Sequence, residues 1–246
     1  MAGPSDEYAP LTVEEDKPGL AEAPCRPGTW AIIVAAGNGS RFGRRKQFAP
    51  LHGRPVLAWS LDVARRICAG VVVVVPDGDG VMEGAAEAGL DLADKVVVGG
   101  ASRSESVRAG LAAVPDDAEV VAVHDAARPL AGLGVWVAAL DAVSGGADGA
   151  IPVVVVTDTI TRVTPDGAHA TLDRTELRAV QTPQAFRAEA LRRAHRNGAD
   201  ATDDAALVVA AGGRVVLVEG HAGNLKITTP SDLAVAAALL AEGFGR

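Results

Sequence analysis

Short apolar runs that alternate with helical stretches restrict the possible fold more than any other feature of the sequence. The runs are bounded by Gly, Pro and Asp and are almost continuously apolar, as in strands that are buried on both faces. Five runs fit this description, at residues 31–35, 71–75, 95–98, 119–123 and 150–156. Helical stretches lie among them, at residues 55–68, 80–88, 102–114 and 133–143. Alternating β and α units predict a Rossmann-like α/β fold with a mostly parallel, doubly wound sheet, which binds ligands at the carboxyl ends of its strands.

Composition and charge narrow the class of protein. With 246 residues, of which 48% are hydrophobic, the chain is long enough to bury a full core in one α/β domain. Its formal net charge of -8 disfavours a nonspecific nucleic-acid binder and a basic membrane-surface protein. No apolar run is long enough to cross a bilayer, and the first residues lack the pattern of a signal peptide. We therefore expect a cytoplasmic protein that binds neither nucleic acid nor membrane.

Residues 1–28 differ from the rest of the chain. They contain five prolines and six acidic residues against Lys17 and Arg26. Such a stretch cannot bury enough apolar surface to offset the entropy lost on ordering. We predict a disordered tail over residues 1–28 and one folded domain over residues 29–246.

The alternation stops in the middle of the domain. Residues 153–163 and 168–174 are typical of strands, and the Thr-Pro-Asp-Gly between them, at residues 164–167, is a strong turn pattern. These residues predict a protruding two-stranded β-arm over about residues 153–178. Because a two-stranded ribbon is marginal alone in water, we expect the β-arm to pack on a second subunit of a homodimer. The domain is completed by helices near residues 187–196 and 203–211, a strand at 214–218 and a helix from Pro230.

A glycine-rich loop follows the first predicted strand. Residues 36–47 read Ala-Gly-Asn-Gly-Ser-Arg-Phe-Gly-Arg-Arg-Lys-Gln. Glycines let backbone N–H groups approach a phosphate, and cationic side chains neutralise it. By pattern alone such a loop can also be only a tight turn, but the crowding of four cations favours a bound polyanion. Phe42 stands where the dinucleotide-binding fingerprint needs its third glycine, which disfavours a nicotinamide-dependent oxidoreductase, and the Gly-Lys-Ser/Thr of a Walker A loop is absent.

Several motifs together resemble one family. Residues 35–43, followed by Lys-Gln-Phe at residues 46–48, resemble the signature of the sugar-phosphate nucleotidyltransferases and, among them, of the 2-C-methyl-D-erythritol 4-phosphate cytidylyltransferases. Further matching blocks follow in order within roughly residues 30–240, at residues 123–129, 158–159, 173–174, 181–184 and 224–226. The resemblance implies transfer of CMP from CTP to 2-C-methyl-D-erythritol 4-phosphate, with release of pyrophosphate, in non-mevalonate isoprenoid precursor synthesis. It also implies Mg²⁺ or another divalent cation on the phosphates and a homodimer in which each β-arm reaches the acceptor site of the other subunit.

The resemblance assigns roles to residues at matching positions. It implies that the catalytic residues are Arg41, Lys46 and Arg174. For the nucleotide it implies a site made by Ala35, Ala36, Gly37, Asn38, Gly39, Gly100, Ser106 and Asp125. For the acceptor it implies Asp125, Arg128, Thr159, Arg174, Thr182 and Lys226, with Asp125 also a candidate metal ligand. Two residues depart from the family pattern, Ala101 where many relatives carry an acid and Arg45 where proline is usual.

Reasoning from the residues alone leaves other interpretations open. Residues 99–106 also fit a strand exit with helix caps, and Asp125 with Arg128 fits an ordinary surface ion pair. We expect His124 to be structural, and Asp203 and Asp204 to cap a helix rather than to bind metal. A ribitol 5-phosphate cytidylyltransferase would share the CTP site and the β-arm. A noncatalytic nucleotide-binding regulator would also fit the glycine-rich loop.

Overall fold

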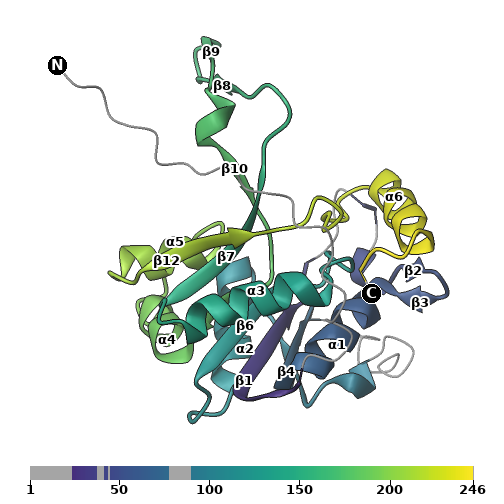
Figure 1. Cartoon of the computed structure of the whole chain (residues 1–246), viewed down its shortest axis with the longest axis vertical. Coiled ribbons are helices and arrows are strands. Elements are labelled where there is room, and N and C mark those ends of the chain that lie inside the picture. Colours follow the sequence, from purple (N-terminus) through teal and green to yellow (C-terminus); the bar gives the residue numbers. More distant parts are fainter. Residues whose placement is uncertain (1–23, 38–41, 44, 78–89, 246) are drawn as a thin grey trace.

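A central sheet organises the computed structural model, which describes residues 24–37, 42–43, 45–77 and 90–245 (Figure 1). Eight strands of the described residues form this sheet: β1 (Arg26–Val34), β4 (Cys68–Val75), β5 (Lys95–Val98), β6 (Val120–Asp125), β7 (Gly149–Val155), β10 (Arg178–Val180), β11 (Gln184–Arg187) and β12 (Val215–Glu219). Their order is β10-β7-β11-β6-β1-β4-β5, and β12 also pairs with β7. The pairs β1–β4, β1–β6, β4–β5 and β7–β12 are parallel, which confirms the predicted mostly parallel sheet.

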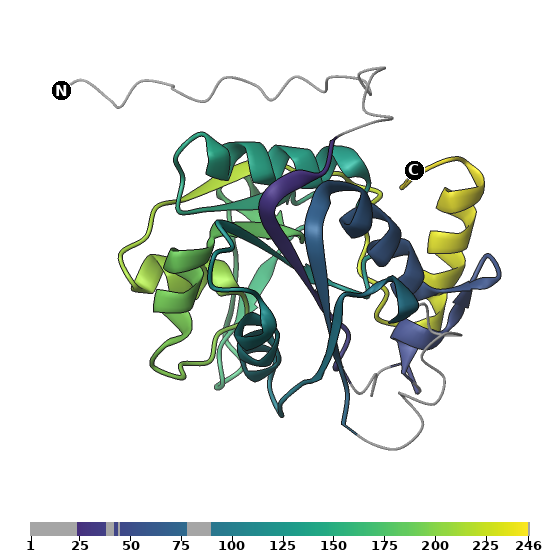
Figure 2. The same cartoon turned by 90° about the horizontal axis from the view of Figure 1, so that it is seen from below.

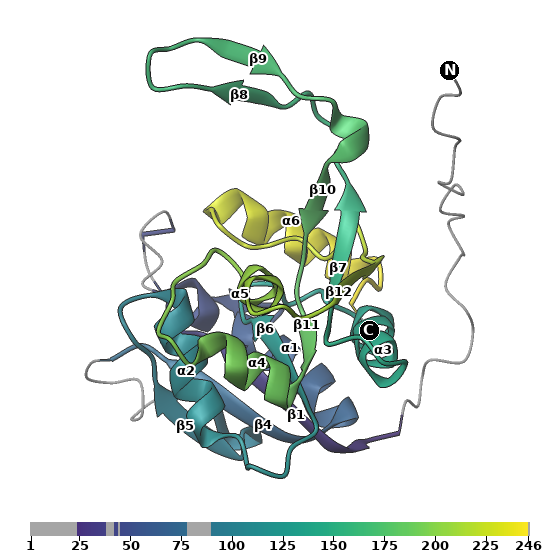
Figure 3. The ribbon, with the colours of Figure 1, turned by 90° about the vertical axis from the view of Figure 1, so that its left-hand side faces the viewer.

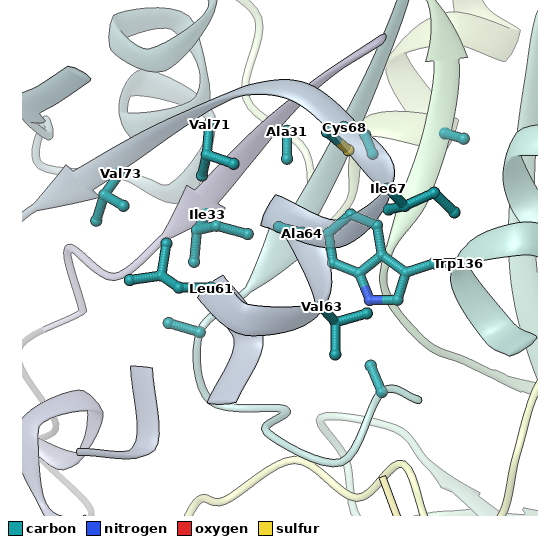
Figure 4. Close-up of a cluster of buried hydrophobic side chains, with 14 of the residues drawn as sticks. Ala31, Ile33, Leu61, Val63, Ala64, Ile67, Cys68, Val71, Val73 and Trp136 are labelled. Atoms are coloured by element: carbon teal, nitrogen blue, oxygen red, sulfur yellow. The ribbon is translucent and has the colours of Figure 1, made fainter. Parts of the chain in front are cut away.

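Helices cover both faces of the sheet. One face carries α1 (Val56–Ile67) and α3 (Leu133–Ser144), and the other carries α2 (Arg103–Ala113), α4 (Ala188–His195) and α5 (Asp204–Ala210) (Figure 2). Successive residues of a strand point to opposite faces. Ala31 and Ile33 of β1 therefore lie in the cluster that holds Trp136 of α3, whereas Ile32 between them lies in the cluster of α2 and α4 (Figure 4). Burial on both faces is the reason why the central strands are continuously apolar.

Some strands of the sheet differ from the sequence prediction. β11 is not foreseen, because its four residues, Gln-Ala-Phe-Arg, make no apolar run. It pairs antiparallel with both β6 and β7, so its position depends on partners that are distant in sequence. β5 is found where it is predicted, but it is the edge strand of the sheet and Val98 is 52% exposed, so the strand is only partly buried.

The β-arm projects from the sheet as predicted, but its strands are shorter (Figure 3). β7 ends at Val155, so the single strand expected over residues 153–163 is wrong. Within the β-arm, β8 (Thr161–Val163) and β9 (His169–Thr171) pair as a short hairpin. Residues 157–171 are all exposed, and without a surface to pack against, longer strands gain no stability there.

The turn at the tip of the β-arm is confirmed. The N–H of Gly167 donates to the carbonyl of Thr164 at 2.9 Å, and the N–H of Thr164 donates to the carbonyl of Ala168 at the same distance. Gly167 has φ +84°, in the left-handed region that favours glycine. The turn pattern of the sequence therefore located the hairpin correctly although the strand lengths were wrong.

The first strand begins earlier than predicted. β1 starts at Arg26, inside the segment that is expected to be a tail. Arg26 pairs with Cys68 of β4, and its guanidinium contacts Asp141 at 2.7 Å, so this end of the strand is held by backbone and side chain. Residues 1–23 of the predicted tail and the helix predicted at 80–88 lie outside the described residues.

A third apolar cluster lies next to the carboxyl ends of the strands. It packs α6 (Pro230–Ala241) against the loop that follows β1, and it includes Phe42, Leu51, Ile227 and Leu240. Phe42, which takes the place of a fingerprint glycine, is thus an apolar anchor for the loop. Among the described residues, no helix is long and apolar enough to cross a membrane.

Candidate active site

A cleft lies at the carboxyl ends of β1, β4, β5 and β6, where a doubly wound sheet is expected to bind its ligand. Its volume is about 640 Å³, which is within the range of small-molecule sites. Of the residues predicted for substrate binding or catalysis, eight line it: Ala35, Ala36, Gly37, Lys46, Gly100, Ser106, Asp125 and Lys226. Of the other predicted residues, Asn38, Gly39 and Arg41 lie outside the described residues.

The beginning and the end of the glycine-rich loop are joined by Gln47. Its buried amide Nε2 donates to the carbonyl of Ala35 at 2.6 Å and to that of Gly37 at 3.1 Å. The N–H of Ala35 also donates to the carbonyl of Val74 at 2.8 Å, which fixes the exit from β1. Lys46, the neighbour of Gln47, is thereby held at the wall of the cleft.

The second wall of the cleft is the turn between β5 and α2. Ser102 caps α2, with Glu105 completing a capping box, so the predicted helix cap is confirmed. Ser106 is buried, and its hydroxyl donates to the carbonyl of Ser102 at 2.9 Å. Gly99 leaves no room for a side chain, because a Cβ there would lie 2.5 Å from Cβ of Ala36 and 2.6 Å from Oγ of Ser106.

Asp125 is the centre of charge in the cleft. It is the last residue of β6, and its carboxylate accepts from Lys226 Nζ at 2.6 Å and from Arg103 Nε at 3.3 Å. Burial alone would raise the pKa of this carboxyl group, but the charges of Arg103, Lys226 and Arg128 outweigh burial and hold the pKa well below its usual range. Asp125 is therefore a fixed anion that orients two cations.

Lys226 reaches the cleft from the C-terminal part of the chain. The N–H of the next residue, Ile227, donates to the carbonyl of Ala127 at 2.8 Å, which lays this segment beside the end of β6. α6 follows at once, capped by Thr229 and Asp232. Backbone N–H groups of Thr229 and Thr228 lower the pKa of the Asp232 carboxyl group, and the charge of Lys46 lowers it further. Lys46 and Lys226 thus lie on opposite segments that meet at one end of the cleft.

Thr182 is buried and is not part of the lining of the cleft. Its buried Oγ1 accepts from the N–H of Asp125 at 3.0 Å and lies 3.0 Å from Nδ1 of His124. Burial lowers the pKa of His124 to about 4, so the ring is neutral at pH 7, and Nε2 lies 3.2 Å from the carbonyl of Arg128. Both side chains hold the end of β6 in place, which agrees with the structural role predicted for His124.

Arg128 lies at the base of the β-arm. Its guanidinium donates to the carbonyl of Asn224 at 2.8 Å and to that of Val180 in β10 at 3.2 Å. It therefore joins the C-terminal segment to the strand that returns from the β-arm. The surface ion pair with Asp125 that the sequence left open is not formed, since the acid contacts Arg103 and Lys226 instead.

Thr159 and Arg174 are remote from the lining of the cleft. Both are exposed, and neither is on a strand: Thr159 lies between β7 and β8, and Arg174 begins a 3-10 turn that ends at Glu176. The guanidinium of Arg174 donates to the carbonyl of Thr157, across the base of the β-arm. Within the described part of one chain, these two residues are not brought to the other predicted site residues.

Sequence reasoning missed two residues that shape the cleft. Gln47 gives no separate signal, because its partners are backbone carbonyls. Arg103 lines the cleft and also contacts Asp204 at 2.7 Å, which is 101 positions away along the chain. Asp203 caps α5 as predicted, whereas Asp204 is fully buried and does not serve as a cap. Among the described residues, no cluster of three or more acidic, histidine or cysteine residues could hold a metal ion.

Comparisons with known proteins agree with one family. The profile of 2-C-methyl-D-erythritol 4-phosphate cytidylyltransferase matches residues 29–242. The protein of that name from Streptomyces avermitilis is 40% identical over 235 residues, which are 89% of this chain and 94% of the relative. The crystal structure of the Thermus thermophilus protein of the same name superposes with a TM-score of 0.72 at 36% identity, covering 85% of this chain and 98% of that one.

Some relatives are longer. The "Bifunctional enzyme IspD/IspF" of Oleidesulfovibrio alaskensis is 42% identical over 225 residues, which are 83% of this chain but 56% of the relative. The chain thus spans about half the length of the bifunctional relatives and nearly all of the Streptomyces avermitilis protein. By profile, sequence identity and fold, the chain belongs to the 2-C-methyl-D-erythritol 4-phosphate cytidylyltransferase family and is an enzyme of that class.

Proposed function

We propose that the cleft binds CTP and that the chain transfers CMP from CTP to 2-C-methyl-D-erythritol 4-phosphate, with release of pyrophosphate, in the synthesis of isoprenoid precursors. The observation that carries this proposal is that Lys46 lines the same cleft as Lys226 and Arg103, which are both paired with one buried acid, Asp125. A cleft with this excess of positive charge suits a triphosphate that must meet a second phosphate.

The nucleoside end of CTP is assigned to the wall near α2. Gly99 lets the turn after β5 pack closely against Ala36 and Ser106, so that these residues form one continuous wall for the base. Because the hydroxyl proton of Ser106 is donated to Ser102, its oxygen presents lone pairs to the cleft and can accept from the amino group of cytosine. The backbone of Ala35 and Gly100 lies on the same lining and supplies the remaining polar groups.

The triphosphate is assigned to the glycine-rich loop. Backbone groups of Ala36 and Gly37, continued by Asn38 and Gly39, would approach its oxygens. Attack of the acceptor phosphate on the α-phosphorus gathers negative charge there, and the reaction needs positioning and charge compensation more than covalent catalysis. Lys46 and Arg41 are assigned to this compensation, with Lys46 held at the cleft wall by the neighbouring Gln47 clamp.

A divalent cation fits this site as part of the nucleotide complex. Both oxygens of Asp125 are engaged by cations, and the described residues offer no cluster of metal ligands. This arrangement suits a Mg²⁺ ion whose ligands are chiefly phosphate oxygens and water. Asp125 is the protein side chain that we assign as a candidate ligand. When bound, the ion would neutralise phosphate charge, in addition to what the lysines do.

The acceptor site is assigned to the region between Lys226, Arg128 and the β-arm of a second subunit. Thr159 and Arg174 lie apart from the cleft of their own chain, so a role in phosphate binding requires that they act on another chain. Apolar side chains that are exposed near or on the β-arm support a homodimer, namely Val155, Val163, Val180 and Leu217. Thr182 is assigned to positioning Asp125 rather than to direct contact. We place the enzyme in the cytoplasm, with no nucleic-acid or membrane partner.

The test is pyrophosphate release from CTP and Mg²⁺ with either of two acceptors at equal concentration. Release with 2-C-methyl-D-erythritol 4-phosphate and not with ribitol 5-phosphate is the expected result. A preference for ribitol 5-phosphate would overturn the acceptor but keep the reaction. Release with neither acceptor would overturn the proposed activity.

A further inference from the structure

Arg103 connects the cleft to a buried acid that lies behind it. The guanidinium donates from Nη1 to Asp204 at 2.7 Å and from Nε to Asp125 at 3.3 Å. Burial would lower the pKa of Arg103, but the two carboxylates together raise it above its usual value. One cation is therefore shared between an acid of the cleft and an acid outside it, and the contact with the acid outside is the shorter.

Asp204 is buried completely, at the start of α5. Its other oxygen, Oδ1, lies 3.0 Å from Nε2 of His195, which is itself buried at the end of α4. A carboxylate with no access to water is stable only if it is paired and hydrogen-bonded. Arg103 on α2 and the imidazole of His195 on α4 supply these partners, so contacts with two other helices fix the position of Asp204.

Asp125 is held between two cations, one on each of its carboxylate oxygens. Its Oδ2 accepts from Lys226 at 2.6 Å, whereas Arg103 contacts Oδ1 at the longer distance of 3.3 Å. Attraction between charges in a partly buried site rises steeply as they approach. If Arg103 were not held by Asp204, it would close on Asp125 and weaken the contact of Asp125 with Lys226.

We infer that Asp204, supported by His195, is a positioning residue that holds Arg103 away from Asp125 and so keeps Asp125 paired with Lys226 across the cleft. This inference rests on the proposed function, in which Lys226 serves the phosphates. It extends the site to two residues, on α4 and α5, that do not line the cleft.

The first variant for the test is Asp204→Asn, which removes the charge and keeps the size. We expect turnover in the pyrophosphate-release assay to fall about tenfold, within the range found for the coupling of contacting charged residues. Asp203→Asn is the matched control, because it makes the same charge change one residue earlier, at the cap of α5. That control should leave turnover within about twofold of the wild type.

A double-mutant cycle with Arg103→Met separates positioning from a merely structural role. If Asp204 acts through the guanidinium, Asp204→Asn should change turnover by less than about twofold once Arg103 is replaced. An equal loss in both backgrounds would overturn the inference, as would a folded Asp204→Asn variant with normal turnover. A wild-type enzyme without activity would instead overturn the proposed function. The wild type is therefore assayed before any variant.

His195 provides a second test that needs no change at Asp204 or Arg103. His195→Gln keeps an N–H donor for Asp204, and His195→Leu removes it. If the donor matters, the glutamine variant should retain turnover within about twofold while the leucine variant loses about fivefold, with circular dichroism confirming that both are folded. Equal turnover of the two folded variants would contradict the inference, even where Asp204→Asn does not fold.

Discussion

In the cleft, Asp125 is buried and contacts Arg103, Lys226 and Thr182, which come from three separate parts of the chain. In the β-arm, residues 157–171 are all exposed, and the guanidinium of Arg174 contacts a carbonyl of the β-arm itself. The cleft is therefore organised within one chain, whereas the β-arm presents its polar residues outward. If the active site needs both regions, the cleft is the part that is already formed in one chain. The β-arm is the part whose position depends on the association of two chains.

The largest expected effect is on the cleft. Lys46→Ala should lower turnover by about 10²–10³-fold, because a preorganised cation at developing negative charge contributes about 3–4 kcal/mol. Lys95→Ala is the matched control, since Lys95 lies in the edge strand β5 and does not line the cleft. Near-normal turnover of a folded Lys46→Ala variant would remove Lys46 from the catalytic residues.

The β-arm should affect the acceptor and not the nucleotide. Arg174→Ala should raise the acceptor KM by about 10–100-fold and leave CTP affinity nearly unchanged, because a hydrogen bond to a charged group contributes about 1.5–3 kcal/mol. Arg162→Ala, also exposed on the β-arm, is the control. An equal loss of CTP affinity, measured by isothermal titration calorimetry, would contradict the assignment of the β-arm to the acceptor site.

Mixing two defective variants tests whether the β-arm acts on the partner. In an equimolar, exchanged mixture of Lys46→Ala and Arg174→Ala chains, half of the dimers are mixed, and each has one site with both residues intact. Activity at low acceptor concentration should recover to about one quarter of the wild-type value. No recovery after subunit exchange, followed by mass spectrometry of tagged chains, would place both residues on the same chain's site.

A smaller effect tests the wall of the cleft near α2. Gly99→Ala would bring a Cβ within 2.5 Å of Cβ of Ala36 and 2.6 Å of Oγ of Ser106, so the wall must shift. Overpacking of this kind costs about 1–3 kcal/mol, and we expect the KM for CTP to rise about tenfold while the acceptor KM changes little. Gly132→Ala is the control, because the nearest atom to its new Cβ lies at 3.7 Å.

The smallest effect expected is on stability, from His124 below the cleft. Its pKa is lowered from 6.5 to about 4, so the unfolded chain binds more protons, and stability is lost as pH falls below about 6.5. Between pH 7 and about 5.5 the loss should be about 1 kcal/mol. Urea unfolding measured across this pH range should show that the free energy of unfolding falls less steeply with pH for His124→Gln than for the wild type. His169→Gln, on the β-arm, should show the same pH dependence as the wild type. Equal slopes for His124→Gln and the wild type would refute the assignment.

The sequence alone was sufficient to predict those parts of the fold that are set by residues close together in the chain. The alternating runs predict the parallel sheet and its ligand edge, and the Thr-Pro-Asp-Gly turn and the cap at Ser102 follow from neighbouring residues. β11 and the pairing of Arg103 with Asp204 could not be derived in this way, because they depend on contacts across long stretches of chain. The lengths of β8 and β9 were overestimated, because the propensity of their residues does not replace a missing packing surface.

Thr182 shows a further limit of reasoning from motifs. Its position in a family block predicts an acceptor-binding residue, but the sequence does not say which way the side chain faces. The structure directs the hydroxyl to the N–H of Asp125 and to His124. In this chain the motif residue Thr182 therefore holds the end of β6 in place.

The entry of Lys226 into the cleft from a late part of the chain has a consequence for protein synthesis. The strands that end at the cleft, β1, β4, β5 and β6, are all translated before residue 126. A nascent chain that stops short of Lys226 holds Asp125 opposite Arg103 alone, and it lacks α6, which completes the apolar cluster around Phe42. Such a chain has the sheet but not the charge balance of the cleft. We therefore expect CTP to be bound only after translation has passed Lys226.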